Sequence, residues 1–300
     1  MNPYLYKAKT RKRVGSLIID LFIMLTLFSV FFSFAIDPIF SAITNVDYYE
    51  EKIDKIQLDS HLYKDDKDEG IILINEKYDE NITKFYLEFN YEDIDENDQK
   101  NHLELYEKAK KDSNLFDYSI DKGWTEKEDI NKDDLEEFYL NELDNAVDLL
   151  NLNKHLNYYS YRMITLRIIS IVISIIFTYL FYNLVLPLIM KKGQTFGRWV
   201  CGLAIVDQFG YNVKYKRMVF RCFVGLFFNV VLALFFAIPW FISITMLIFS
   251  KNAITIQDYF SLTYVVDVRE STFFNSKEEQ KEFEKKNKNK EYKYVHQKGY

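Results

Sequence analysis

An arginine and an aspartate open the first long apolar segment of the chain, in the run Arg13-Val14-Gly15-Ser16-Leu17-Ile18-Ile19-Asp20. Because seven residues make two helical turns, both side chains fall on one face of a helix. A carboxylate about 10 Å into a bilayer is costly unless it is paired or solvated, and such groups mark cation and proton pathways. A structural ion pair is the alternative. Arg13 and Asp20 are therefore candidate binding or ion-coupling residues.

A third candidate, Asp258, lies far along the chain, just before the strand-like run Leu262-Thr263-Tyr264-Val265-Val266. If the C-terminal tail is cytoplasmic, Asp258 returns to the membrane face that holds Arg13. We then expect one polar centre in which Asp20 accepts a cation or proton. Arg13 would tune Asp20 by competing for its carboxylate, and Asp258 would be the alternate partner of Arg13.

A basic stretch after the second apolar segment contains the run Lys191-Lys192-Gly193-Gln194-Thr195-Phe196-Gly197-Arg198-Trp199. Gly193 and Gly197 permit a tight entry into a helix, Thr195 suits its N-cap, and Arg198 lies where an anion can bind. The spacing is not that of a phosphate loop. We expect a short interfacial helix, anchored by Trp199 and bound to anionic lipid headgroups.

Three apolar runs must position these residues, at about 14–36, 163–190 and 219–249, and each exceeds the roughly 18 residues of a transmembrane candidate. Five bases and no acid in residues 1–13 predict a cytoplasmic N-terminus. A signal peptide cleaved after Ser33-Phe34-Ala35 is disfavoured, because the run is too long and carries Asp20.

The third run leaves the number of crossings open at three or four. Residues 219–249 give about 46 Å of helix, long for one crossing and short for two, and Pro239 can break it. The tail 271–300, with eight lysines, is expected to be disordered and cytoplasmic, which favours a helical hairpin. Residues 191–218 then form a cytoplasmic loop with a small hairpin (203–206 with 211–213), and 250–270 a membrane-proximal segment.

The first span delivers residues 37–162 to the outer face. This stretch holds 34 of the 44 acidic residues of the chain, and it is long enough to form a domain. Runs 70–74 and 84–89 are typical of paired strands, and 99–111 and 133–156 of amphipathic helices, so we expect an α+β lobe. In the second span, Arg167, Ser170, Ser174 and Thr178 form a polar stripe suited to helix packing.

The residue pattern gives no support for an enzyme. It contains no Ser/His/Asp set, no Cys/His metal spacing and only two cysteines. Asp93, Asp95, Asn97 and Glu104 match calcium-loop positions, but Asp98 replaces the required glycine. We expect no cofactor, no metal and no nucleic-acid partner.

The same stretches resemble the RDD family of membrane proteins, named for an arginine and two aspartates. Arg13 to Asp20 resembles the family's opening motif, Gly193 to Arg198 its G-x-T-x-G-K motif, and Gln257-Asp258 with Thr263 to Val266 its terminal motifs; Arg221 also matches a common arginine. The departures are the acidic insert, Arg198 for lysine, Gln257 for histidine, and the absence of glycine in Ser261-Leu262. A role in transport is what the resemblance implies.

We therefore predict an α-helical polytopic protein of the cell membrane, with three or four transmembrane helices and an inserted α+β extracytoplasmic lobe. Its expected function is transport of an ion or small solute. The alternative is a non-transporting sensor or interaction protein that uses the lobe. Since three or four spans are few for a transporter, a homo-oligomer is compatible with either function.

Overall fold

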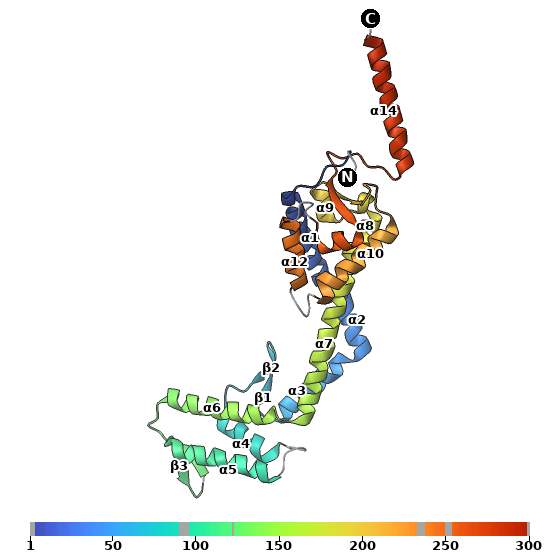
Figure 1. Ribbon diagram of the computed structural model, residues 1–300. Coiled ribbons are helices and arrows are strands. Elements are labelled where there is room, and N and C mark those ends of the chain that lie inside the picture. Colours follow the sequence, from blue (N-terminus) through green and yellow to red (C-terminus); the bar gives the residue numbers. More distant parts are fainter. Residues whose placement is uncertain (1–3, 90–95, 122, 233–237, 250–253, 299–300) are drawn as a thin grey trace. The chain divides into compact units, whose positions relative to one another are not determined.

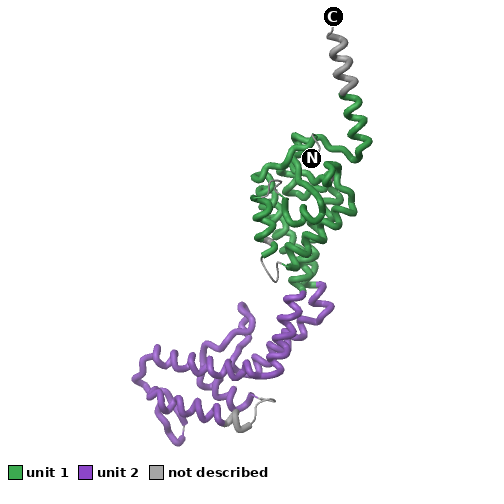
Figure 2. Tube along the Cα trace, viewed as in Figure 1, with its two compact units in different colours: residues 1–38, 170–300 green, residues 39–169 purple. Residues whose placement is uncertain are grey.

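The computed structural model describes residues 4–89, 96–121, 123–232, 238–249 and 254–298 (Figure 1). Contacts divide the chain into two compact units (Figure 2). Unit 1 comprises residues 1–38 and 170–300, and unit 2 comprises residues 39–169. In sequence, unit 2 is an insertion into unit 1.

Two long apolar helices are candidate membrane spans. Helix α1 (Thr10–Phe31) runs through the π-helical segment η1 (Phe32–Ile36) into α2 (Asp37–Thr44). Likewise, α7 (Lys154–Leu180) runs through η2 (Phe181–Val185) into α8 (Leu186–Ile189). The two continuous helices have 35 and 36 residues and mean hydropathies of 2.4 and 2.2. Each is about 50 Å long and exceeds the roughly 30 Å hydrocarbon core of a bilayer.

The exposure pattern of these helices is the reverse of that in a water-soluble protein. The buried residues of α1 are Arg13, Ser16 and Asp20, whereas Phe22 and Leu25 are more than half exposed. On α7, Ser170, Ser174 and Thr178 are buried and apolar neighbours face outward. Extended exposed apolar surface of this kind suits lipid rather than water. The burial of Ser170 and Ser174 agrees with the predicted packing role of the stripe, whereas Thr178 borders a cavity and Arg167 bonds Glu50 at 2.8 Å.

The third apolar run forms shorter pieces. Helix α10 (Tyr215–Leu226) continues into η4 (Phe227–Val231), and α12 (Ile238–Phe249) follows. The helix made of α10 and η4 is about 26 Å long and α12 about 18 Å, each less than a bilayer core of about 30 Å. The link at 233–237 lies outside the described residues, so the choice between one span and a hairpin stays a prediction.

A small sheet joins distant parts of unit 1. Strand β5 (Leu203–Asp207) pairs antiparallel with β6 (Thr263–Asp267), with Leu203 opposite Asp267. The N-terminal arm lies along β6, where the Ala8 amide donates to the Val265 carbonyl at 3.3 Å. The predicted hairpin between 203–206 and 211–213 is wrong except for a single bridge between Val206 and Asn212. Both β5 and its partner β6 are buried along most of their length.

The remaining elements of unit 1 are short or terminal: η3 (Lys191–Gly193), α9 (Phe196–Val200), α13 (Ile256–Ser261) and α14 (Lys277–Lys298). The prediction of disorder throughout 271–300 is wrong, because this segment contains α14. Phe283 of α14 packs edge-on against Tyr4 and contacts Phe274, with ring centroids 5.8 and 5.4 Å away. Three aromatic rings thus tie the start of this charged helix to the N-terminal arm.

Unit 2 combines helices with two small hairpins around its own core. Its helices include α3 (Val46–Asp59), α4 (Tyr78–Glu88), α5 (Glu96–Ser113) and α6 (Lys132–Leu150). The hairpins pair β1 (Tyr63–Asp66) with β2 (Gly70–Leu73), and β3 (Phe116–Ser119) with β4 (Gly123–Glu126). Fully buried core residues include Leu62, Ile82, Phe85 and Ala146. This arrangement agrees with an α+β unit.

Three local predictions in unit 2 need comment. Residues 84–89, predicted as a strand, belong mostly to α4, because Ile82, Phe85 and Tyr86 are spaced to bury one helical face. The true partner of β2 is β1. Helix α6 ends at Leu150 and does not run on to 156. Residues 90–95, which begin the calcium-like pattern, lie outside the described residues.

Candidate functional site

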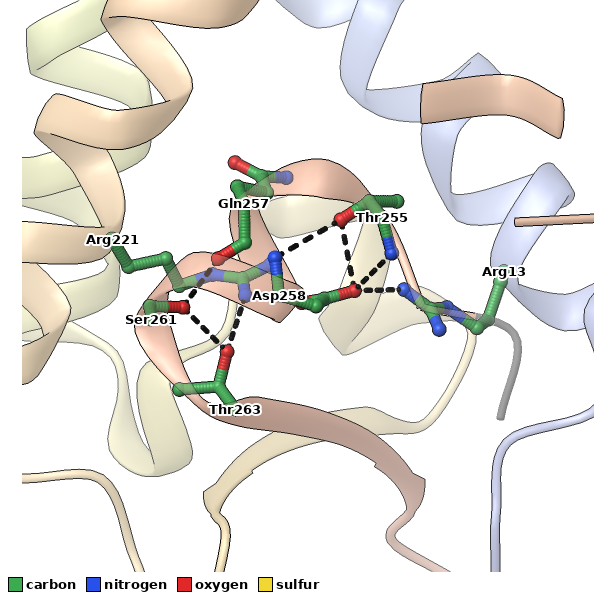
Figure 3. A network of polar contacts seen from close by, with 7 residues as sticks. All are labelled: Arg13, Arg221, Thr255, Gln257, Asp258, Ser261 and Thr263. Carbon is green, nitrogen blue, oxygen red and sulfur yellow. Dashed lines mark hydrogen bonds and ion pairs between the residues drawn. The ribbon is translucent and has the colours of Figure 1, made fainter. Parts of the chain in front are cut away.

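Asp258 lies at the start of α13, where it completes a capping box with Thr255 (Figure 3). Its Oδ2 accepts the Thr255 amide at 3.0 Å and the Thr255 hydroxyl at 2.9 Å. A reciprocal bond of this type satisfies backbone donors at a helix N-terminus. The carboxylate of Asp258 is completely buried, so its charge needs further partners.

Two arginines from different helices supply those partners. Arg13 of α1 donates from Nη2 to Asp258 Oδ2 at 2.6 Å. Arg221 of α10 donates from Nη1 to Asp258 Oδ1, and also to the Thr263 hydroxyl at 2.7 Å. Both arginines are buried, and Figure 3 shows them reaching Asp258 from opposite sides. The network therefore joins α1, α10 and α13.

The electrostatics of this network favour an ionised Asp258. Burial opposes ionisation, but the guanidinium groups of Arg221 and Arg13 outweigh it and hold the pKa of the Asp258 carboxyl well below its ordinary value of 3.8. Outside the centre, Asp267 of β6 pairs with Lys12, whose side chain is 35% exposed. Asp258 is thus the buried anchor of the charge network, and Asp267 is a nearby ion pair in contact with solvent.

Asp20 has a separate set of partners, none of them charged. Its Oδ1 accepts the Tyr182 hydroxyl and, at 2.8 Å, the Gly197 amide. Its Oδ2 accepts the Thr195 hydroxyl at 2.9 Å and, more weakly, the Ser16 hydroxyl at 3.4 Å. Four donors, from α1, η2 and the N-cap and first turn of α9, thus surround one carboxylate.

The motif between Gly193 and Arg198 therefore binds an anion that belongs to the chain itself. Thr195 occupies the N-cap position of α9, as predicted, but its hydroxyl goes to Asp20 and not to the α9 backbone. Asp20 occupies the anion position at this helix start, and binding of anionic lipid headgroups to the basic residues around it stays a prediction. Trp199 is 55% exposed on α9, as an interfacial anchor would be.

At two positions of the motif, glycine is required because neighbouring atoms leave no space for a side chain. A Cβ on Gly197 would lie 2.4 Å from the Ser16 carbonyl and 2.6 Å from Asp20 Oδ1. Gly193 has φ +62°, and a Cβ there would lie 2.2 Å from Met218 Cε. Close approach of α9 to α1 thus depends on Gly197, and the turn before α9 on Gly193.

Arg198 borders two cavities. A small one of about 30 Å³ is lined by Arg13, Asp20, Arg198 and Arg221 among others. A larger one of about 430 Å³ is lined by Asp20 and Arg198 together with residues of α1, α7, η4 and α12. Burial and the nearby Arg221 lower the pKa of Arg198 to about 10, so it remains positively charged at neutral pH. Arg198 is the basic side chain that faces the larger cavity.

The structure brings the predicted site residues together, but in a different pairing. Arg13 and Asp20 both border the small cavity, yet Arg13 pairs with Asp258, so the predicted competition for the Asp20 carboxylate is not seen. Arg221, matched only through the family resemblance, proves to be the second partner of Asp258. Tyr182 and Thr255 also belong to the site but were not predicted from the sequence. Their sequence signal is limited to a polar side chain inside or beside an apolar run. Among the described residues, no cluster of His, Cys, Asp and Glu could hold a metal ion.

The fold and this site define a mostly helical, membrane-associated protein whose buried charges are paired between helices. The model of the RDD family matches residues 152–261. This match, over 110 of the 300 residues, supports the resemblance to the RDD family that the motifs predict. The matched stretch includes Gly193 to Arg198, Arg221 and Asp258, whereas Arg13 and Asp20 precede it. Comparison with curated proteins and with solved structures gave no match.

Proposed function

We propose that this protein is a multi-pass protein of the cell membrane that binds a small solute in the larger cavity of unit 1 and transports it. The observation that carries this proposal is the cavity of about 430 Å³ that Asp20 and Arg198 line. Its volume lies in the range of about 300–1,000 Å³ typical of ligand sites. The basic residues of 1–13 and 191–217 favour a cytoplasmic N-terminus, and with it an outer-face location of unit 2.

Within this proposal, the charged residues have different roles. The pairs of Arg13 and Arg221 with Asp258 hold α1, α10 and α13 in a frame around the cavity. Asp20 is a positioning residue, because four donors already occupy its oxygens and leave little room for a cation. By binding the segment that precedes Arg198, Asp20 holds Arg198 at the cavity.

Thiol labelling tests the cavity and the transport without a known solute. Ser243 is 8% exposed and lines the cavity from α12. In a background with Cys201→Ser and Cys222→Ser, we expect Ser243→Cys to react with a charged, membrane-impermeant methanethiosulfonate reagent. A transporter that alternates its access should show reaction from either side of a sealed vesicle.

The matched control is Phe22→Cys in the same background. Phe22 is 69% exposed on α1 and is not part of the cavity wall, so it should face lipid and stay unlabelled. Labelling of Ser243→Cys from one side only would contradict transport. No labelling at all would contradict a solute-accessible cavity.

A second candidate function is recognition by unit 2. The observation that favours it is the separate hydrophobic core of residues 39–169, which is expected of a segment that folds alone. The isolated fragment should then be helical by circular dichroism and capture a partner from cell-envelope extract. An unfolded fragment, or one that captures nothing, would count against this function.

A further inference from the structure

The polar centre of unit 1 carries an unmatched positive charge. It contains three arginines (Arg13, Arg198 and Arg221) and two aspartates (Asp20 and Asp258). Arg13 and Arg221 share Asp258, while Asp20 is bound by neutral donors. Among the described residues, no ion pair joins Arg198 to a carboxylate. Since a poorly solvated charge without a counter-charge is costly, the centre favours one added anion.

Arg198 presents this charge to the larger cavity, whose remaining wall is predominantly apolar. Helix α1 alone contributes Leu17, Leu21, Met24, Leu25 and Phe28, and α7, η4 and α12 add Ile175, Val230, Ile244 and Leu247. From Asp20 to Phe28, the α1 side of the wall is about 12 Å long. The cavity therefore combines a predominantly apolar wall with a charged end, where the Arg198 guanidinium lies near Asp20, a carboxylate already bound by four neutral donors.

A buried hydroxyl indicates that the cavity is more than a packing defect. Thr178 of α7 lines it, is 3% exposed, and has an Oγ1 with no hydrogen-bond partner among the described residues. Buried polar atoms are nearly always paired in folded proteins, with protein, water or ligand. A ligand or ordered water in the cavity would supply the missing partner.

We propose that the larger cavity binds a single-chain anionic amphiphile. Its carboxylate or phosphate head contacts the Arg198 guanidinium, and its alkyl chain lies along the apolar wall. This inference rests on the proposed solute cavity and names the chemical class of the solute. A cavity of about 430 Å³ accommodates one alkyl chain of medium length, whereas a two-chain phospholipid needs more room.

The test uses the full chain in nanodiscs of phosphatidylcholine, with radiolabelled dodecanoate as the probe and empty nanodiscs as the blank. We expect saturable binding of one dodecanoate per chain. Dodecyl phosphate should compete with it, whereas dodecanol and dodecyltrimethylammonium should not, since neither pairs with a cation. This competition series needs no variant, so it remains decisive if a substitution impairs folding.

Variants then assign the head group to Arg198. Arg198→Gln should weaken dodecanoate binding by at least about tenfold, or about 1.4 kcal/mol, whereas Arg198→Lys, which keeps the charge, should retain more of it. Lys216→Gln is the matched control, because Lys216 is exposed on α10 and does not line the cavity. Its binding should equal that of the parent.

Several results would overturn the inference. Equal competition by dodecanol would show that the head charge is not recognised, and displacement by phosphatidylglycerol but not by dodecyl phosphate would exclude a single-chain ligand. Unchanged binding in a folded Arg198→Gln protein would remove Arg198 from the site. If Ser243→Cys is labelled from both sides but dodecanoate does not bind, the proposal of a solute cavity is supported and the proposal of an anionic amphiphile as its ligand is refuted.

Discussion

Removal of the Asp258 charge is expected to destabilise unit 1 severely. In Asp258→Asn, the buried guanidinium groups of Arg13 and Arg221 lose their shared carboxylate and are left facing each other. Removing one partner of a buried ion pair costs about 3–5 kcal/mol. For a unit of 169 residues, each kcal/mol lowers the melting temperature by about 2–4 °C, so we expect a decrease of roughly 6–20 °C.

The chain contains its own reporter for this measurement. Cys222 follows Arg221 on α10 and is 3% exposed, so its thiol should react with a maleimide fluorophore only when α10 opens. We would heat a Cys201→Ser background in detergent and record Cys222 labelling with temperature. Asp258→Asn should shift the temperature at which Cys222 becomes labelled to a lower value. The substitution adds no thiol, so Cys222 remains the labelled residue.

The matched control is Asp267→Asn, which breaks the pair with the partly exposed Lys12. Although the Asp267 side chain is only 4% exposed, Lys12 is 35% exposed and stays in contact with water when Asp267 loses its charge, so the transition should move less than in Asp258→Asn. If Asp258→Asn shifts the transition no more than Asp267→Asn does, the Arg13–Asp258–Arg221 network does not hold unit 1 together. The double variant Arg13→Gln/Asp258→Asn should cost less than the sum of the two single variants.

Four further outcomes are expected. Because the folded Asp258 has a lowered pKa, its contribution should be complete above about pH 5 and be lost as pH falls below its ordinary value of 3.8; acid melting followed by tryptophan fluorescence should show this loss, and Asp258→Asn should flatten it. Gly197→Ala should cost at least about 1.5–3 kcal/mol, because its Cβ forces α9 away from α1 and breaks the hydrogen bond from the Gly197 amide to Asp20, whereas Gly15→Ala, whose new Cβ meets only Cys201 Sγ at 3.9 Å, should not destabilise the same thiol-monitored transition. Tyr182→Phe should cost about 1.5–3 kcal/mol by removing one donor to Asp20, and an unchanged Cys222 transition would refute that role. Phe85→Ala should cost unit 2 about 3–5 kcal/mol and abolish cooperative unfolding of the 39–169 fragment by circular dichroism, with no effect on Cys222 labelling in the full chain.

The sequence identified the charged members of the site and offered Asp258 as the alternate partner of Arg13, but it favoured Asp20 as the main partner and did not predict that Arg221 also pairs with Asp258. Arg13, Asp20 and Asp258 were found because charges in or beside apolar runs are expensive and therefore informative. Helical spacing placed Arg13 and Asp20 on one face, and the structure agrees. Spacing cannot show that Arg13 lies nearer to a residue 245 positions away, since that contact depends on how α13 packs against α10.

The apolar helices and the packing stripe on α7 were predictable because their signals are local and repeated. Strand partners were not, because β5 and β6 are separated by more than fifty residues and a nearer candidate existed at 211–213. The strand predicted at 84–89 failed for a related reason. Over six residues, a helical and an extended apolar pattern look alike, and the core of unit 2 decides between them.

The long separation between partners has a consequence for biogenesis. When Arg13 is added to the nascent chain, its partner Asp258 is still 245 residues from being made. At translation rates of about 5–20 residues per second, that delay is roughly 12–50 s. The interval is shorter for Asp20, whose donors are complete once the segment around Gly197 is synthesised. During this interval the side chains of Arg13 and Asp20 on the nascent first helix have no partners. We therefore expect the helix to remain beside the insertion machinery or at the water interface before it enters lipid.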